Sequence, residues 1–232
     1  MTHAAHGHAS HPTADAEARL NPAANWLWFA PAIGHTSALV IGDISPSYLR
    51  GLSPHFERIE RIPVASLYRA VVRSDPRAPG SIRFVFGEAS MDFVIATDLV
   101  SGWSDSGRSP FRDPRFVAAL TDIRRLLRPG GVLFLSGHNA RWHRRLLRRQ
   151  GPGLRLGEAK RALMRAGFAE TRAYFVEPSV GDVAAVVPAC RQAAVAYERE
   201  RAPRHGVPWR ALWAAGALYE SLYPDAFVLA IT

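Results

Sequence analysis

The sequence predicts an α/β protein with a mostly parallel sheet, and residues 116–136 give the main reason. Apolar residues recur at helical spacing in the first half of this segment. A Pro-Gly-Gly turn at 129–131 then forbids continuation of the helix, and an apolar run follows at 132–136. A helix, a tight turn and a buried strand in this order form one unit of a parallel sheet. Two further apolar runs, at 37–42 and 93–96, have the continuous hydrophobicity of central parallel strands.

The N-terminal half predicts three strands after a flexible tail. Residues 1–24 are rich in His and Ala and have little apolar surface to bury, so we expect no ordered structure there. The strand at 37–42 precedes a short helix at 48–52 and a second strand at 59–64. Phe84 to Phe86 then lead through a Gly-Glu turn into the strand at 93–96.

The C-terminal half continues the alternation and then changes in character. The expected elements are a helix at 113–127, a strand at 132–136, a helix at 156–166 and a strand at 170–176. Residues 178–223 have the pattern of two helices broken near 203–208, and the apolar run at 226–231 is a final strand.

Length and composition favour one domain over residues 25–232. The chain has 232 residues, of which 48% are hydrophobic, enough for a single sizeable core. The single cysteine, Cys190, excludes an intramolecular disulfide framework. No apolar run is long enough for a membrane span, and the N-terminus lacks the apolar region of a signal peptide, so we expect a cytoplasmic protein.

The net charge of +9 raises the question of a nucleic-acid partner. All but one of the 29 basic residues are arginine, and their densest cluster lies at 141–149 beside Trp142, Leu146 and Leu147. This pattern indicates an amphipathic helix whose basic face either contacts an anionic partner or lies in water. We expect the solvated face, and therefore no nucleic-acid binding. The N-terminal histidines lack a scaffold for metal ligation, and we expect no metal site.

Three motifs together resemble those of class I S-adenosylmethionine-dependent methyltransferases. They are the segment at 127–136, the upstream run MDFVIATDL at 91–99 and the downstream run LMRAGF at 163–168. The resemblance covers residues 37–232. It implies a Rossmann-like, seven-stranded sandwich whose last strand is antiparallel and lies between the fifth and sixth strands. Residues 178–223 would then form a helical cap inserted before that strand.

The resemblance places S-adenosyl-L-methionine at the carboxyl ends of the parallel strands, against the loop after the first strand. Gly42 matches the first glycine of the family's loop, whereas Ile44 and Pro46 replace the second and third. We expect a Gly42→Val change to abolish cofactor binding and to leave the fold largely intact. Asp43 and Ser45 are candidates for cofactor contact, or else they only cap the helix that follows.

Three residues beyond the first loop complete the candidate site. Glu60 stands a residue or two before the position at which the family's acidic residue ends the second strand, and it would bind the ribose hydroxyls. Asp98, at the end of the next strand, would contact the cofactor or orient the acceptor, or it is only a turn residue. His138 follows the strand at 132–136 and is a candidate base for an acceptor that must lose a proton, the alternative being a surface or capping histidine.

The sequence thus supports two functional hypotheses. The first is transfer of a methyl group from S-adenosylmethionine to an O or N nucleophile of a small molecule or a modified peptide or saccharide. The second is an inactive relative that keeps the fold as a binding or partner-regulating module, because the first cofactor loop is degenerate. No Gly-x-Ser-x-Gly elbow, Walker A motif or metal-spaced Cys/His set is present in the sequence.

Overall fold

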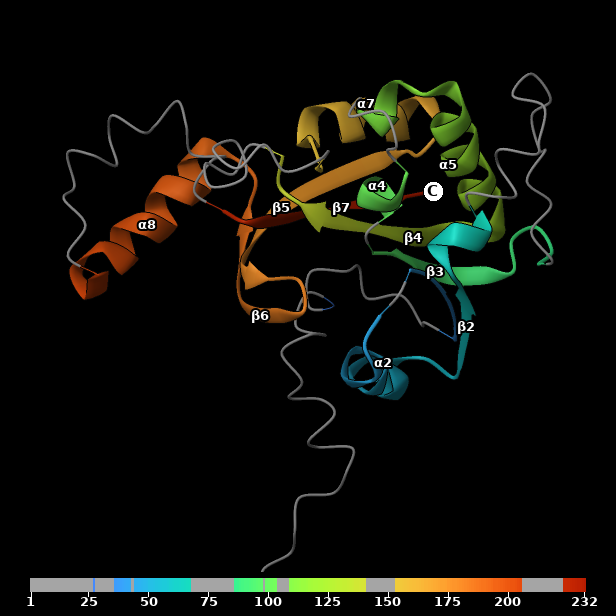
Figure 1. Ribbon diagram of the computed structural model, residues 1–232, viewed down its shortest axis with the longest axis horizontal. Helices are drawn as coiled ribbons and strands as arrows, with labels where there is room; N and C mark the ends of the chain where they lie inside the picture. Colours follow the sequence, from blue (N-terminus) through green and yellow to red (C-terminus); the bar gives the residue numbers. More distant parts are fainter. Residues whose placement is uncertain are drawn as a thin grey trace, which may run out of the picture.

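Seven strands form one sheet within the part of the chain that the computed structural model describes (Figure 1). The described residues are 27, 36–42, 44–67, 86–97, 99–103, 109–140, 153–205 and 223–232. In spatial order the strands are β2 (Arg58–Ile62), β1 (Ser37–Ile41), β3 (Met91–Ala96), β4 (Leu127–His138), β7 (Asp225–Ile231), β5 (Glu170–Ser179) and β6 (Asp182–Pro188).

The strand directions confirm the predicted fold class. β1 pairs in parallel with β2 and β3, and β3 pairs in parallel with β4. β7 lies between β4 and β5 and runs antiparallel to both. The last strand along the chain therefore occupies an interior position in a mostly parallel sheet, as the resemblance to class I methyltransferases implies.

Helices cover both faces of the sheet (Figure 1). α4 (Leu99–Gly102), α5 (Pro114–Leu126) and α7 (Leu156–Arg165) pack on one face, whereas α2 (Pro46–Leu52) packs on the other. α8 (Arg191–His205) follows β6, and two short 3₁₀ helices, η2 (Ser53–His55) and η3 (Pro110–Arg112), precede β2 and α5. The central strands carry apolar side chains on both faces because each face has its own cover.

The two faces of β1 show how this arrangement divides the core. Leu39 and Ile41 belong to the cluster beneath α5 and α7, and Ala38 and Val40 to the cluster beneath α2. All four side chains are fully buried. Alternate residues of a strand point to opposite faces, so a strand covered on both sides has apolar residues at consecutive positions.

The turn predicted at 129–131 lies inside β4 instead of before it. β4 begins at Leu127, which pairs with Met91, and the register then shifts before Val132 pairs with Phe93. Gly130 has a φ of +78°, a value that glycine adopts without strain. The Pro-Gly-Gly segment therefore ends α5 as predicted, but it forms an irregularity of the ladder and the strand starts earlier than 132.

The helical cap predicted at 178–223 is wrong in its first part. Residues 182–188 form β6, which pairs antiparallel with β5 and makes a hairpin at the edge of the sheet. The segment contains Val183, Val186 and Val187, whose branched side chains favour strands, and Val183 and Val187 are buried in the core. A helix does follow, as α8, and residues 206–222 lie outside the described part of the chain.

Asp92 of β3 forms hydrogen bonds with residues at the amino-terminal ends of β1 and β4. Its Oδ2 accepts hydrogen bonds from the backbone amides and the hydroxyls of Thr36 and Ser37 at 2.7 to 3.0 Å. Its Oδ1 accepts from Arg128, near the start of β4, at 2.7 Å. Burial would raise the pKa of the Asp92 carboxyl, but these hydrogen bonds outweigh burial and hold the pKa well below its ordinary value.

Gly42 is required by the packing of β1 against β3, and its replacement is expected to destabilise the fold. Its φ is +140°, and a Cβ atom there would lie 2.5 Å from Thr97 Oγ1 and 2.6 Å from Thr97 O. We expect Gly42→Ala to lower the free energy of unfolding by about 2 to 4 kcal/mol, from left-handed strain plus overpacking. Chemical denaturation measures this change.

The matched control is Gly137→Ala, because a Cβ at Gly137 would lie no closer than 3.7 Å to its neighbours. Equal stability of the two variants would contradict the steric explanation. The expectation that Gly42→Val leaves the fold largely intact is wrong, since the added side chain would collide with the backbone of Thr97.

Candidate functional site

A cavity of about 260 Å³ opens at the carboxyl ends of β1, β3 and β4. β2 lies on one side of β1 and β3 on the other, so the chain reverses its direction across the sheet at this point. Ligands of open α/β sheets bind at such a switch point, outside the carboxyl ends of the strands. The position of the cavity therefore makes it the candidate site.

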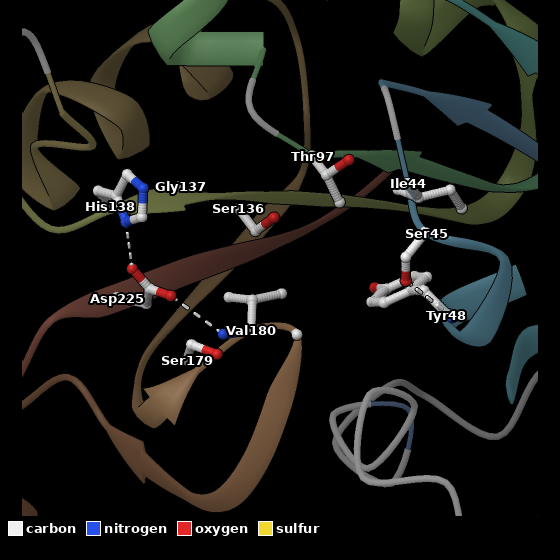
Figure 2. Close-up of a pocket in the computed structure, with 11 residues that line it drawn as sticks. Ile44, Ser45, Tyr48, Thr97, Ser136, Gly137, His138, Ser179, Val180 and Asp225 are labelled. Carbon is white, nitrogen blue, oxygen red and sulfur yellow. Dashed lines mark hydrogen bonds and ion pairs between the residues drawn. The ribbon is translucent and has the colours of Figure 1, made fainter.

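Three groups of residues and Asp225 line the cavity, and Figure 2 shows them arranged around it. The loop after β1 and the first turn of α2 contribute one wall, and the ends of β3 and β4 form the floor. The turn between β5 and β6 closes the opposite side. The lining residues are Ile44, Ser45 and Tyr48 from the first group, Thr97, Ser136, Gly137 and His138 from the second, Ser179, Val180 and Gly181 from the third, and Asp225 at the start of β7.

Ser45 caps α2 at the edge of the cavity. Its Oγ accepts a hydrogen bond from the backbone amide of Tyr48 at 3.2 Å, and Pro46 occupies the first turn. Both features are typical of helix starts. The capping interpretation of Ser45 is therefore confirmed, and the same residue lines the cavity.

Thr97 brings a buried hydroxyl to the floor of the cavity. The residue is 7% exposed, and its Oγ1 has no hydrogen-bond partner among the described residues. Its backbone amide donates to Ile41 O at 3.1 Å and so holds the end of β3 against β1. An unpartnered buried hydroxyl is rare in native proteins and marks a place where a polar group of a ligand, or a water, completes the bonding.

His138 and Asp225 form a close pair at the same edge of the sheet. His138 Nδ1 lies 2.6 Å from Asp225 Oδ1, and the second oxygen of the carboxylate, Oδ2, accepts a hydrogen bond from Val180 N at 3.0 Å. Asp225 is 4% exposed, whereas the His138 side chain is 58% exposed. A carboxylate only accepts hydrogen bonds, so the pair favours the neutral tautomer with the proton on Nδ1 and the basic lone pair on Nε2.

The pairing of β4 with β7 puts these two side chains opposite each other. His138 and Asp225 are partners in the antiparallel register. Asn139, the next residue, donates from its side chain to Tyr223 O at 3.0 Å and from its backbone to Pro224 O at 2.8 Å. These bonds fasten the segment that enters β7 to the end of β4.

The predicted site residues divide into three groups. Ser45 and His138 line the cavity. Gly42 is buried beside Thr97 and Glu60 pairs with Arg58 at 2.7 Å on β2, and neither is among the lining residues. Asp43 and Asp98 lie outside the described residues, as do the arginine cluster at 141–149 and the histidine-rich N-terminus.

Sequence reasoning missed Thr97, Asp225 and the turn at 179–181. Asp225 immediately precedes the predicted strand at 226–231. Because an antiparallel strand starts at the edge where its parallel neighbours end, that position was a signal for a site residue. Thr97 carries no such signal, and the turn was hidden by the helical prediction for 178–223.

Among the described residues, no His, Cys, Asp and Glu side chains form a group of three or more that could hold a metal ion. Within the same residues, every helix is too short or too polar to cross a membrane.

No family model and no curated protein matches this chain. Among solved structures, it is similar to the N-methyltransferase NodS from Bradyrhizobium japonicum WM9 in complex with S-adenosyl-L-homocysteine. The TM-score is 0.48 and the identity 14%, over 97% of this chain and 89% of that one. A possible histamine N-methyltransferase from Thermotoga maritima has a TM-score of 0.48 and 9% identity, over 90% and 87% of the two chains.

A third similar structure is phosphoethanolamine N-methyltransferase 2 from Haemonchus contortus, with a TM-score of 0.46 and 17% identity. It covers 89% of this chain, which spans about half of its length, 51%. All three are described as established or possible methyltransferases. Because the TM-scores are below 0.5, these likenesses decide neither the activity nor the substrate of this chain.

Proposed function

We propose that this protein is an S-adenosylmethionine-dependent methyltransferase that acts on an O or N nucleophile of a small molecule or of a modified peptide or saccharide. The observation that carries the proposal is the His138–Asp225 pair on a cavity at the switch point of the sheet. S-adenosylmethionine, when bound, supplies an electrophilic methyl group.

The cavity suits a ligand with hydroxyl and amino groups. Its floor carries the unpartnered hydroxyl of Thr97 and the hydroxyl of Ser136, and its rim carries the hydroxyls of Ser45 and Tyr48. We assign the cofactor to the side of the cavity lined by Ser45, Tyr48 and Thr97. The opposite side, lined by His138 and the β5–β6 turn, is then the acceptor pocket. The cavity volume of about 260 Å³ is just under the range of ~300–1,000 Å³ usual for small-molecule sites. Asp43 and Asp98, the sequence neighbours of Ile44 and Thr97, remain our candidates for further contacts.

His138 is the proposed base. Methyl transfer depends mainly on the orientation of the acceptor, and a base is needed where the acceptor is a hydroxyl or an ammonium group that must lose a proton. In the tautomer that Asp225 favours, Nε2 of His138 can take this proton, and the resulting imidazolium lies beside a buried carboxylate that stabilises its charge. A base held in this way favours hydroxyl and amine acceptors.

Calorimetric titration with S-adenosylmethionine and S-adenosylhomocysteine tests the proposal. We expect both to bind at one site and to raise the free energy of unfolding, by about 2.7 kcal/mol at a ligand concentration of 100 Kd. Absence of binding at millimolar ligand would overturn the proposal and favour a binding or partner-regulating module with this fold.

The variant Thr97→Val connects this binding to the cavity. Valine keeps the shape of threonine but removes the unpartnered hydroxyl, so we expect the free energy of unfolding to stay the same or to rise by about 1 kcal/mol. If the hydroxyl bonds to the cofactor, affinity falls by about 1 to 3 kcal/mol. A variant with lower stability and unchanged affinity would show that the hydroxyl serves the fold.

A further inference from the structure

The carboxylate of Asp225 joins two sides of the cavity. Oδ1 contacts His138 Nδ1 at 2.6 Å and Oδ2 accepts from Val180 N at 3.0 Å, and Figure 2 shows both interactions. One partner is a side chain at the end of β4, and the other is the backbone of the turn between β5 and β6. Because Asp225 is 4% exposed, water competes little for either oxygen.

The turn that Asp225 holds is a wall of the cavity. β5 and β6 pair up to Ser179 and Asp182, which leaves Val180 and Gly181 as the connecting residues. Both line the cavity, and Val180 faces Tyr48 of α2 across it (Figure 2). The Val180 side chain also packs against the core cluster beneath α2. The contact with Asp225 therefore fixes a backbone segment that limits the space beside His138.

We propose that Asp225 is a positioning residue that couples the base to the wall of the acceptor pocket. The same carboxylate sets the tautomer of His138 and fixes the position of the β5–β6 turn. One group therefore positions both the proposed base and the cavity wall beside it. The catalytic meaning of this coupling rests on the proposed function. The coupling itself is a property of the Asp225 and His138 side chains and the Val180 backbone amide, and it can be measured without the cofactor.

The chemistry of the two partners makes the coupling testable by a single-atom change. Both partners of Asp225 donate hydrogen bonds, and only a carboxylate can accept from both. Asparagine offers one accepting oxygen and one donating amide. The backbone amide of Val180 can only donate, whereas His138 can move its proton from Nδ1 to Nε2. In Asp225→Asn we therefore expect the side-chain oxygen to accept a hydrogen bond from Val180 N. The side-chain amide then donates to a deprotonated Nδ1 of His138.

The experiment is nitrogen NMR of protein labelled with ¹⁵N at histidine, recorded above the titration range of the imidazoles. The signals of His138 are assigned by their loss in His138→Gln, since the chain has nine histidines. We expect the Nδ1–H tautomer in the parent and a reversal to the Nε2–H tautomer in Asp225→Asn. An unchanged tautomer in Asp225→Asn would overturn the proposal.

Hydrogen exchange at the Val180 amide tests the other half of the coupling. We expect protection to persist in Asp225→Asn and to fall by about tenfold in Asp225→Ala, the factor for loss of one hydrogen bond. The control is Asp182→Asn, an exposed carboxylate at the other end of the same turn, which should change neither measurement. Unchanged Val180 protection in Asp225→Ala would overturn the role of Asp225 in seating the turn.

These results separate the coupling from the proposed function. A tautomer reversal together with absent cofactor binding would keep the coupling and remove methyl transfer. Cofactor binding together with an unchanged tautomer would keep the proposed function and remove the coupling. If Asp225→Ala fails to fold, Asp225→Asn still tests both halves of the coupling. The tautomer of His138 is read directly in that variant. Loss of Val180 amide protection in it would contradict the expected hydrogen bond from Val180 N to the asparagine oxygen.

Discussion

Replacement of Asp92 by asparagine is expected to lower the free energy of unfolding by about 2 to 4 kcal/mol. Hydrogen bonds to a charged group are worth about 1.5 to 3 kcal/mol each, and loss of one partner of a buried ion pair costs about 3 to 5 kcal/mol. Arg128 is 46% exposed and regains water when the pair is lost, which lowers the estimate. An asparagine amide would also point a donor at one of the donors that Asp92 now accepts from. Urea denaturation of parent and variant at pH 7 measures the difference.

The same residue makes this difference depend on pH. Because the folded-state pKa of Asp92 lies below its value in the unfolded chain, its stabilisation is complete above about pH 4 and is lost as the pH falls toward the folded-state pKa. The parent and Asp92→Asn should therefore converge in stability in acid. Asp182→Asn, a change at an exposed position, should stay within about 0.5 kcal/mol of the parent at every pH. A difference between parent and Asp92→Asn that is constant from pH 7 to pH 2 would show that the charge of Asp92 is not involved.

Replacement of His138 by glutamine is expected to slow methyl transfer by about 10² to 10⁴-fold, the usual contribution of a general base. Glutamine can donate a hydrogen bond to Asp225 but cannot take a proton at neutral pH. Because the change lies on the acceptor side of the cavity, affinity for S-adenosylhomocysteine should remain within about threefold, or 0.6 kcal/mol, of the parent. The measurement is S-adenosylhomocysteine formation with hydroxyl and amine acceptors, beside calorimetry of the product.

His55→Gln is the control for that measurement, since His55 lies in η2 and is not among the cavity residues. Equal rates for His138→Gln and the parent would refute the role as a base. An equal loss of rate and of product affinity would assign His138 to cofactor binding instead.

β1 and β3 could be predicted because both are buried on both faces. Each contains an apolar run of four residues, 38–41 in β1 and 93–96 in β3, which is typical of a buried parallel strand. β6 could not be predicted in the same way. It is an edge strand with a mixed burial pattern, and the proline at 178 is equally typical of a helix start.

The candidate site was predictable only where a side chain follows a recognisable strand. His138 was found because it ends the apolar run of β4. Glu60 lies within β2, two residues before the strand ends at Ile62, and pairs with Arg58, so its role in cofactor binding stays a prediction. The unsatisfied hydroxyl of Thr97 and the two contacts of Asp225 arise from the packing of segments far apart in sequence. The local sequence around either residue therefore does not predict them.

The interior place of β7 determines when the sheet can be completed during synthesis. The 45 residues that separate Val180 from Asp225 take about 2 to 9 s to translate at ~5–20 residues per second. Until β7 emerges, β4 and β5 each present an open edge where it will later insert, and open edges invite pairing with other chains. During that interval these two edges are the part of the nascent sheet most open to pairing with other chains. Asp225, the partner of His138, belongs to the same strand, so an intermediate that lacks β7 also lacks the assembled pair.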